Sequence, residues 1–250
     1  MAVAPAMPES DRPSIPLAAS GSPRDLKSAF RYFIQMPSVQ FILVAIAVPL
    51  TLRLLHGGFG VWDLAVVALM GIVWPMQEWV LHKYLLHLKP FSILGKKVDP
   101  VFARTHRLHH REPWHLPYTF LPADVLLVAA PLTAAIWFLL LPGYGLAMTA
   151  VVAFNVMGLL YEWTHYLTHT RYIPKGKYYR RIWKNHRLHH CKNENYWFAF
   201  TIPHVDALMK TEPDAAKVKT SGTCRTLGVE DSLGVGSEPV GVAEEAVGNP

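Results

Sequence analysis

The stretch Val125–Tyr161, "VLLVAAPLTAAIWFLLLPGYGLAMTAVVAFNVMGLLY", decides the fold class because its 37 residues include no charge. The "LPGYG" in its middle is typical of a turn, so the stretch predicts two apolar helices joined by a tight turn. Each helix approaches the ~20 residues that cross the hydrocarbon core of a bilayer. A soluble bundle with buried helices is the alternative, but an uncharged hairpin of this length fits it poorly.

Two more uncharged segments precede this stretch, at 32–52 and 64–77. The second extends from Val61 through His87 as one long helix, whose last turns would lie beyond the hydrocarbon. The composition agrees, because only 17% of the residues are charged, whereas a soluble domain is about one quarter charged. We therefore expect an all-α integral membrane protein with a four-helix scaffold and a cytoplasmic helical cap.

The distribution of lysine and arginine predicts the orientation of this scaffold. Four precede the first span, seven lie in 83–123 and twelve follow His165, whereas the "LPGYG" turn has none. Basic loops favour the cytoplasmic side. Both termini and the cap are thus expected in the cytoplasm, of an inner membrane in a bacterium or of the endoplasmic reticulum in a eukaryote. We attribute the net charge of +6 to basic loops that lie beside anionic lipid, and not to binding of nucleic acid.

The two ends of the chain differ in composition from the middle. Residues 1–30 are largely rich in Pro, Ser and Ala, and residues 211–250 are rich in Gly, Ser, Val and Glu without apolar periodicity. Such segments bury too little apolar surface to fold alone. We expect disorder at 1–30, a membrane domain at 31–210 and a disordered tail at 211–250.

Ten of the thirteen histidines fall into four clusters. Each of the two spans that return to the cytoplasm ends in a two-histidine cluster, "HKYLLH" or "HYLTH", and each is followed by a three-histidine "HRLHH". This order is a duplicated half-site. The clusters are His82 and His87; His106, His109 and His110; His165 and His169; His186, His189 and His190.

The spacing within the clusters indicates shared helix faces. Residues three and four apart lie on one side of a helix, so each "HRLHH" is expected to point its three rings the same way. His165 and His169 are one turn apart. His82 and His87 are five apart, about 140° around an ideal helix. Either the helix ends or bulges between them, or the two contact different ions.

Neutral imidazole is a good ligand for iron, zinc, copper or nickel. Ten rings exceed the three or four protein ligands typical of a single zinc. The two half-sites therefore predict a dinuclear metal centre just outside the membrane. The two cysteines form no C-x-x-C pair, so neither a disulfide framework nor a thiolate zinc site is expected. Cys191, next to His190, is at most a reserve ligand.

Glu78 and Glu162 precede His82 and His165 by four and three residues. Each carboxylate is expected to share a helix face with its histidine and to accept the second imidazole N–H, which raises the basicity of the ring. Direct ligation of a metal is the alternative. His115 and His204 stand alone and are assigned to loops or a substrate pocket, and His56 is given a structural role.

These histidines resemble the pattern of the fatty acid hydroxylase / sterol desaturase superfamily over about Trp74–Asp206. All ten histidines stand in the order of the family pattern and at the family's spacing. "EWVLHKYLLH" is similar to the region around the first box of fatty acid hydroxylases, and "RRIWKNHRLHHCKNENYWFAFT" to the last box. Asp206 falls where the family often has an aspartate, which adds it to Glu78 and Glu162 as a supporting residue. Residues 211–250 have no counterpart in the resemblance.

The resemblance implies an O2-dependent di-iron enzyme that hydroxylates a fatty acyl chain of a membrane lipid. Its cofactors would be two iron ions, which zinc can replace during purification. Because no haem-binding "HPGG" sequence occurs, a fused cytochrome b5 domain is not expected. The electrons would come from a separate protein of the ferredoxin or cytochrome b5 type. The alternatives are a carotenoid hydroxylase of the β-carotene type and a sterol desaturase or oxidase. Aromatic substrate-pocket candidates, or interfacial anchors, join His115: Trp114, Tyr118, Phe120, Tyr196, Trp197 and Phe198.

Two alternatives from other classes remain open. A membrane metal transporter or store would need ionisable residues deep within the spans, and Asp63, Glu78, Asp124 and Glu162 all stand near predicted span ends. A bis-histidine haem protein needs only two axial rings, which leaves most of the ten unexplained.

Overall fold

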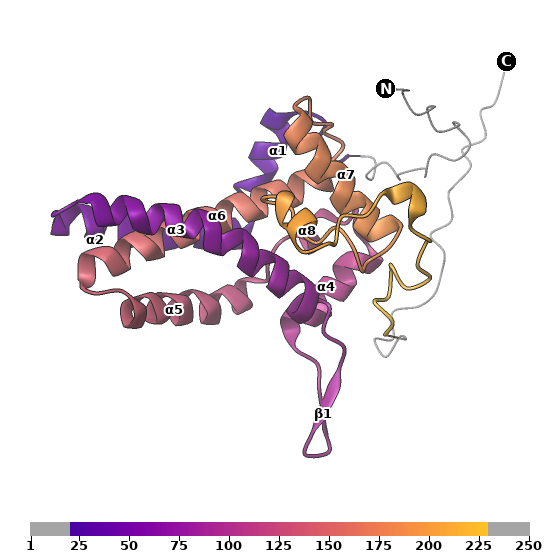
Figure 1. Cartoon of the computed structure of the whole chain (residues 1–250), viewed down its shortest axis with the longest axis horizontal. Coiled ribbons are helices and arrows are strands. Elements are labelled where there is room, and N and C mark those ends of the chain that lie inside the picture. Colours follow the sequence, from indigo (N-terminus) through magenta and orange to yellow (C-terminus); the bar gives the residue numbers. More distant parts are fainter. Residues whose placement is uncertain (1–20, 230–250) are drawn as a thin grey trace.

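The computed structural model of the chain describes residues 21–229. It is mainly helical, with four long helices running side by side and shorter helices gathered at one end of them as a cap (Figure 1). The expectations for residues 1–20 and 230–250 lie outside the described residues.

The elements follow one another in this order: α1 (Leu26–Phe33), α2 (Pro37–His56), α3 (Val61–Val80), the π-helix η2 (Leu81–Leu86), β1 (Phe91–Ile93), β2 (Lys96–Val98), α4 (Val101–Arg111), the 3-10 helix η3 (Leu116–Thr119), α5 (Ala123–Leu140), α6 (Tyr144–Thr168), α7 (Lys177–Cys191), α8 (His204–Leu208) and the 3-10 helix η4 (Ala215–Lys217).

Four helical segments are long and apolar enough to cross a membrane: Pro37–His56, Val61–Leu86, Leu116–Leu140 and Tyr144–Thr168. This confirms the all-α fold with a four-helix membrane scaffold. The turn predicted from "LPGYG" separates α5 from α6, and Gly143 within it has a φ of 79°, a conformation that favours glycine. The one departure from an all-helical chain within residues 21–229 is the antiparallel hairpin β1–β2, which projects from the body (Figure 1).

A buried polar cluster ties α2, α3 and α6 together at the end of the scaffold away from the cap. The Arg53 guanidinium lies 2.7 Å from the Asp63 carboxylate, and both contact the Thr149 hydroxyl. Charges inside a membrane scaffold persist where they are paired in this way. The His56 ring lies beside Tyr144, with 5.1 Å between centroids, in agreement with a structural role.

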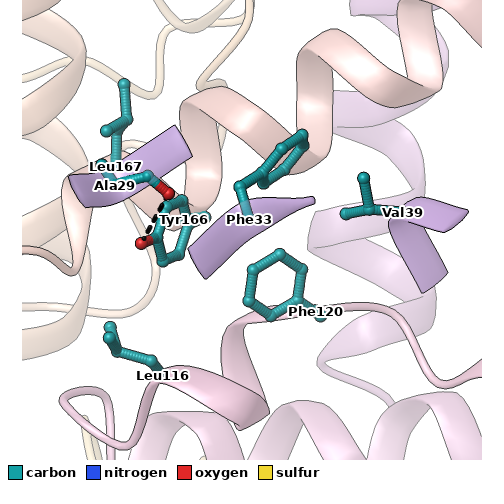
Figure 2. Packing of buried hydrophobic residues seen from close by; sticks show 7 residues of the cluster. All are labelled: Ala29, Phe33, Val39, Leu116, Phe120, Tyr166 and Leu167. Atoms are coloured by element: carbon teal, nitrogen blue, oxygen red, sulfur yellow. Dashed lines mark hydrogen bonds between the residues drawn. The ribbon is translucent and has the colours of Figure 1, made fainter. Parts of the chain in front are cut away.

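Helix α1 packs on the cap end of α6 (Figure 2). Ala29 and Phe33 are buried there, and the Tyr166 hydroxyl donates to the Ala29 carbonyl at 3.2 Å. The helix starts after Asp25, whose carboxylate accepts from the N–H groups of Lys27 and Ser28, as an N-cap does. The segment 1–30 was expected to be disordered, but α1 begins at Leu26 and includes its last five residues.

Residues 211–229 also differ from the expectation, because they are folded against the cap near the end of α7 (Figure 1). Trp197 N–H donates to the Thr211 carbonyl at 2.8 Å, and Cys224 and Leu227 are buried. Individual hydrogen bonds to neighbouring loops hold this segment, with no helix or strand longer than η4. Apolar periodicity, on which the expectation of disorder rested, does not report such bonds.

Candidate metal centre

All ten clustered histidines meet in the cap, at the ends of α3–η2, α4, α6 and α7. Nine are buried and His87 is half-buried. They form two groups of five, and within each group the nearest ring nitrogens lie within 4.8 Å of one another. The first group is His82, His87, His106, His110 and His189. The second group is His109, His165, His169, His186 and His190.

The two half-sites exchange their middle histidines. The first group takes His189 from the second half of the sequence, and the second group takes His109 from the first half. A helix turns about 100° per residue, so His106 and His110 lie about 40° apart, while His109 lies about 60° to the other side of His106. The expectation that the three rings of "HRLHH" point the same way was therefore wrong in detail, because the middle ring faces the other group.

The spacing of His82 and His87 is explained by η2, which continues α3 as a π-helix. Wider i→i+5 turns bring residues five apart toward one face. The two ring centroids lie 5.1 Å apart, and both rings belong to the first group. The structure thus agrees with the bulge that was one of the expected explanations.

The ring nitrogens are arranged as metal ligands require. Four pairs of Nε2 atoms face each other: His165 and His109 at 3.1 Å, His186 and His169 at 2.9 Å, His190 and His186 at 3.0 Å, His189 and His110 at 3.3 Å. The buried Nε2 atoms of His82, His87 and His106 have no hydrogen-bond partner among the described residues. Buried polar atoms without partners are costly, and an ion in the first group would satisfy these three. In the second group, an ion would be the shared partner of the facing Nε2 atoms. The residues therefore fit two metal ions.

Burial also keeps the rings in the form that binds metal. Desolvation lowers the pKa of His110 to about 3. It lowers the pKa of His106, His109, His186 and His189 well below the usual value, assisted by neighbouring rings. These imidazoles are consequently neutral at pH 7, and a neutral imidazole has a free lone pair for a metal.

Three backbone carbonyls hold the outer nitrogens of the first group. His82 Nδ1 lies 2.6 Å from the Phe198 carbonyl, His189 Nδ1 lies 2.7 Å from the Tyr196 carbonyl, and His110 Nδ1 lies 2.8 Å from the Cys224 carbonyl. A carbonyl only accepts, so each Nδ1 carries the proton and each Nε2 is free to face an ion. Sequence reasoning missed these partners, because any residue type supplies a carbonyl.

The structure gives Glu78 and Glu162 other partners than the expected histidines. The Glu78 carboxylate accepts from the backbone N–H groups of Phe200 and Thr201, at 2.7 and 3.0 Å, and from the Thr201 hydroxyl. Glu162 accepts from the Leu121 N–H at 3.0 Å. Both carboxylates are buried. Glu78 therefore holds the loop from which the Phe198 carbonyl reaches His82.

Asp206 holds the same loop from the other side. Its carboxylate accepts from the Phe198 and Ala199 N–H groups at 3.0 and 2.8 Å and from the Thr211 hydroxyl at 2.6 Å. Asp206 is fully buried. Its position after the last box is thus explained by the loop it clamps, and not by contact with an imidazole.

Asp206→Asn is expected to destabilise the cap. The new NH2 group would face N–H or hydroxyl donors and leave a buried donor unpaired, at a cost of about 1–3 kcal/mol. The measurement is the thermal unfolding midpoint of purified protein in detergent. Asp214→Asn is the matched control, because Asp214 is exposed and caps η4, a role that asparagine also fills. Equal midpoints for the two variants would contradict the clamp.

An apolar cavity of about 200 Å³ lies within the membrane scaffold, between α3, α5 and α6, and reaches His82 of the first group. A smaller hollow of about 20 Å³ touches His106 of the first group and His165 of the second. The two spaces share Leu86, Leu121 and Tyr161 as walls. The apolar cavity itself reaches only the first group, through His82.

The expected substrate-pocket residues lie elsewhere. His115 is exposed beside Tyr118, and Trp114 lies 4.8 Å from the Arg187 guanidinium. None of the seven candidates lines the apolar cavity, although Tyr118 and Phe120 border the small hollow and Tyr196 and Phe198 border a polar hollow beside His87. The cavity is lined instead by residues of the predicted spans, among them Trp74, Leu81, Ala129, Ala130, Phe154, Gly158 and Tyr161.

Comparison with known proteins gives matches to fatty acid hydroxylases. A profile of the family described as fatty acid hydroxylase matches residues 67–211. The dihydroceramide fatty acyl 2-hydroxylase FAH1 of Arabidopsis thaliana is 26% identical over 208 residues, which cover 79% of this chain and 83% of that protein. The fatty acid 2-hydroxylase of Homo sapiens is 26% identical over 151 residues, which cover 59% of this chain and 40% of that protein. The match therefore spans less than half of the human relative.

A solved structure of full-length scs7p, in which only the hydroxylase domain is visible, has a similar fold. The TM-score is 0.58 at 19% identity, and the match covers 76% of this chain and 69% of that chain.

Proposed function

The chain belongs to the fatty acid hydroxylase family, and on this premise we propose that it is an O2-dependent di-iron enzyme that inserts a hydroxyl group into a fatty acyl chain of a membrane lipid. The named relatives are hydroxylases, so the chain is assigned to the oxidoreductases. The observation that carries the proposal is the apolar cavity between membrane spans that reaches His82. Such a cavity suits an alkyl chain, and the neighbouring histidines suit the metal.

Each histidine group would hold one iron ion, and zinc can replace iron in such imidazole sites during purification. When bound, the iron supplies the activation of dioxygen and the removal of hydrogen from an unactivated C–H bond. The residues of the chain bind and orient. The carbonyls of Phe198, Tyr196 and Cys224 fix three rings, and the buried cap keeps bulk water away from the reacting carbon.

The substrate is expected to enter sideways from the lipid. Helix α5 has no buried residue, so it covers the cavity only loosely. A membrane lipid keeps its headgroup at the surface and its chain toward the bilayer centre, and the histidine groups lie at the cap end of the spans. The carbons closest to the carboxyl group would therefore reach the centre first. This supports hydroxylation near that end, such as the 2-position acted on by the named relatives.

The cap is placed on the cytoplasmic side, with both termini. This orientation rests on the lysine and arginine residues, twelve of which follow His165, and on the preference of basic loops for that side. Electrons would reach the centre from a separate protein of the ferredoxin or cytochrome b5 type.

Lipid mass spectrometry tests the proposed function. Cells that express the chain should contain acyl chains heavier by one oxygen atom, with fragment ions that place the hydroxyl near the carboxyl end. Cells with the empty vector, or with a variant that lacks a clustered histidine, should not. Oxygen found only on carotenoids or sterols, or on no lipid at all, would refute acyl hydroxylation.

A further inference from the structure

The segment Lys219–Gly228, termed the strap below, lies beyond the residues that match the family profile, which end at 211. One of its backbone atoms nevertheless reaches the metal centre. The Cys224 carbonyl accepts from His110 Nδ1 at 2.8 Å, and both residues are buried. The strap thus supplies the outer partner of one histidine of the first group.

Glu194, in the loop after α7, holds the strap in place. Its carboxylate oxygen Oε1 accepts from the Ser221 hydroxyl at 3.0 Å and from the Thr223 hydroxyl. Glu194 is only 6% exposed, so these bonds are largely shielded from water and are charge-assisted. Ser221 and Thr223 both precede Cys224 closely in the sequence, so Glu194 holds the strap directly before the Cys224 carbonyl.

Hydrogen bonds to backbone carbonyls complete the attachment on both sides. Ser221 N–H donates to the Lys192 carbonyl at 2.7 Å, and the side-chain amide of Asn193 donates to the Lys219 carbonyl at 3.1 Å. Arg225 donates to the Arg111 carbonyl at the end of α4 at 3.0 Å. The strap therefore bridges the two helices that carry the "HRLHH" clusters.

We propose that Glu194 is a positioning residue for the metal centre, which fixes the strap so that the Cys224 carbonyl orients His110 toward the ion of the first group. The inference rests on the proposed function, because it requires an ion there. With the carbonyl in place, Nδ1 keeps its proton and the Nε2 lone pair faces the metal. Loss of such an outer partner typically weakens metal binding by about 10–100-fold.

The effect should be confined to one of the two ions. His110 belongs to the first group, and none of the five members of the second group bonds to the strap in residues 21–229. Disturbing the strap should therefore weaken the ion of the first group and leave the other in place. Damage to the cap as a whole would instead release both.

The experiment measures zinc bound per chain in purified full-length protein in detergent, against a graded series of chelator concentrations. Glu194→Ala, and separately the double variant Ser221→Ala/Thr223→Val, should weaken one of two ions by about 10–100-fold, so that the zinc content falls from two toward one. Glu194→Gln keeps an oxygen acceptor at the same place and should restore most of the binding.

Glu212→Ala is the matched control. Glu212 also ties the C-terminal segment to α7, through Arg181 and Asn185, but it positions no carbonyl on a clustered histidine. It should lower the thermal unfolding midpoint and leave two ions bound. The inference is overturned if Glu194→Ala binds zinc like the parent. It is also overturned if Glu194→Ala loses both ions together, whether or not Glu212→Ala does the same. A parent protein that binds no zinc would overturn the proposed metal centre as well.

Discussion

His109→Ala and His189→Ala should each abolish hydroxylation while the protein still inserts into the membrane. Each variant removes a ring from the interior of a buried group. Loss of an outer partner alone weakens metal sites by about 10–100-fold, so loss of the ligand itself should lower activity by at least roughly 100-fold. The measurements are hydroxylated product per mole of membrane-inserted protein and metal content after purification.

Because the two groups exchange their middle histidines, the two variants should weaken different ions. His109 stands in the first half of the sequence but belongs to the second group, and His189 shows the reverse. His109→Ala should therefore weaken the ion held mainly by α6 and α7, and His189→Ala the ion held mainly by η2 and α4. His115→Ala is the control, because His115 is exposed and outside both groups. Full activity in either variant would contradict the proposed metal centre.

Ala130→Phe should block the acyl-chain cavity without disturbing the metal. Ala130 lines the cavity on α5, and a phenyl ring there would occupy space assigned to the substrate chain. A single methylene in a hydrophobic pocket already changes catalytic discrimination by roughly 10–200-fold, and a phenyl ring is larger than a methylene. Activity on long acyl chains should fall by at least that factor, with metal content unchanged and with shorter chains affected less.

The control for this variant is Ala135→Phe on the same helix. Ala135 is exposed and does not line the cavity, so the same change of side chain should leave activity unaltered. If the two variants behave alike, the cavity is not the path of the substrate. Equal losses on short and long chains would point to the same conclusion.

The scaffold was predictable because charge is so costly in hydrocarbon. The uncharged run Val125–Tyr161 alone predicted two of the four helices, and the structure places α5 and α6 there. The ten histidines were predictable as a set, because their spacing on helix faces is visible in the letters. The resemblance built on them was confirmed by the family match.

Other features of the metal centre cannot be predicted from residue types. The partners of His82, His110 and His189 are backbone carbonyls, which any residue supplies. The π-helical turns of η2 and the exchange of His109 with His189 depend on how the helices approach each other in space. The nearness of Glu78 and Glu162 in sequence to histidines predicts imidazole partners, whereas both carboxylates accept from backbone N–H groups.

The ends of the cap were hard to predict for a related reason. Helix α1 depends on a single N-cap, Asp25, and on packing against α6. The strap depends on Glu194 and a few backbone bonds. The strap has little apolar content, and α1 is a short helix at the end of a segment otherwise rich in Pro, Ser and Ala, so composition predicts neither.

The most direct test of the metal centre is the number and coordination of ions in protein purified from iron-supplied cells, by elemental analysis together with X-ray absorption spectroscopy. The two histidine groups predict two ions per chain, coordinated by imidazole nitrogen and oxygen without sulfur. Protein that binds no transition metal, that shows thiolate coordination, or that carries haem with a Soret band would contradict it.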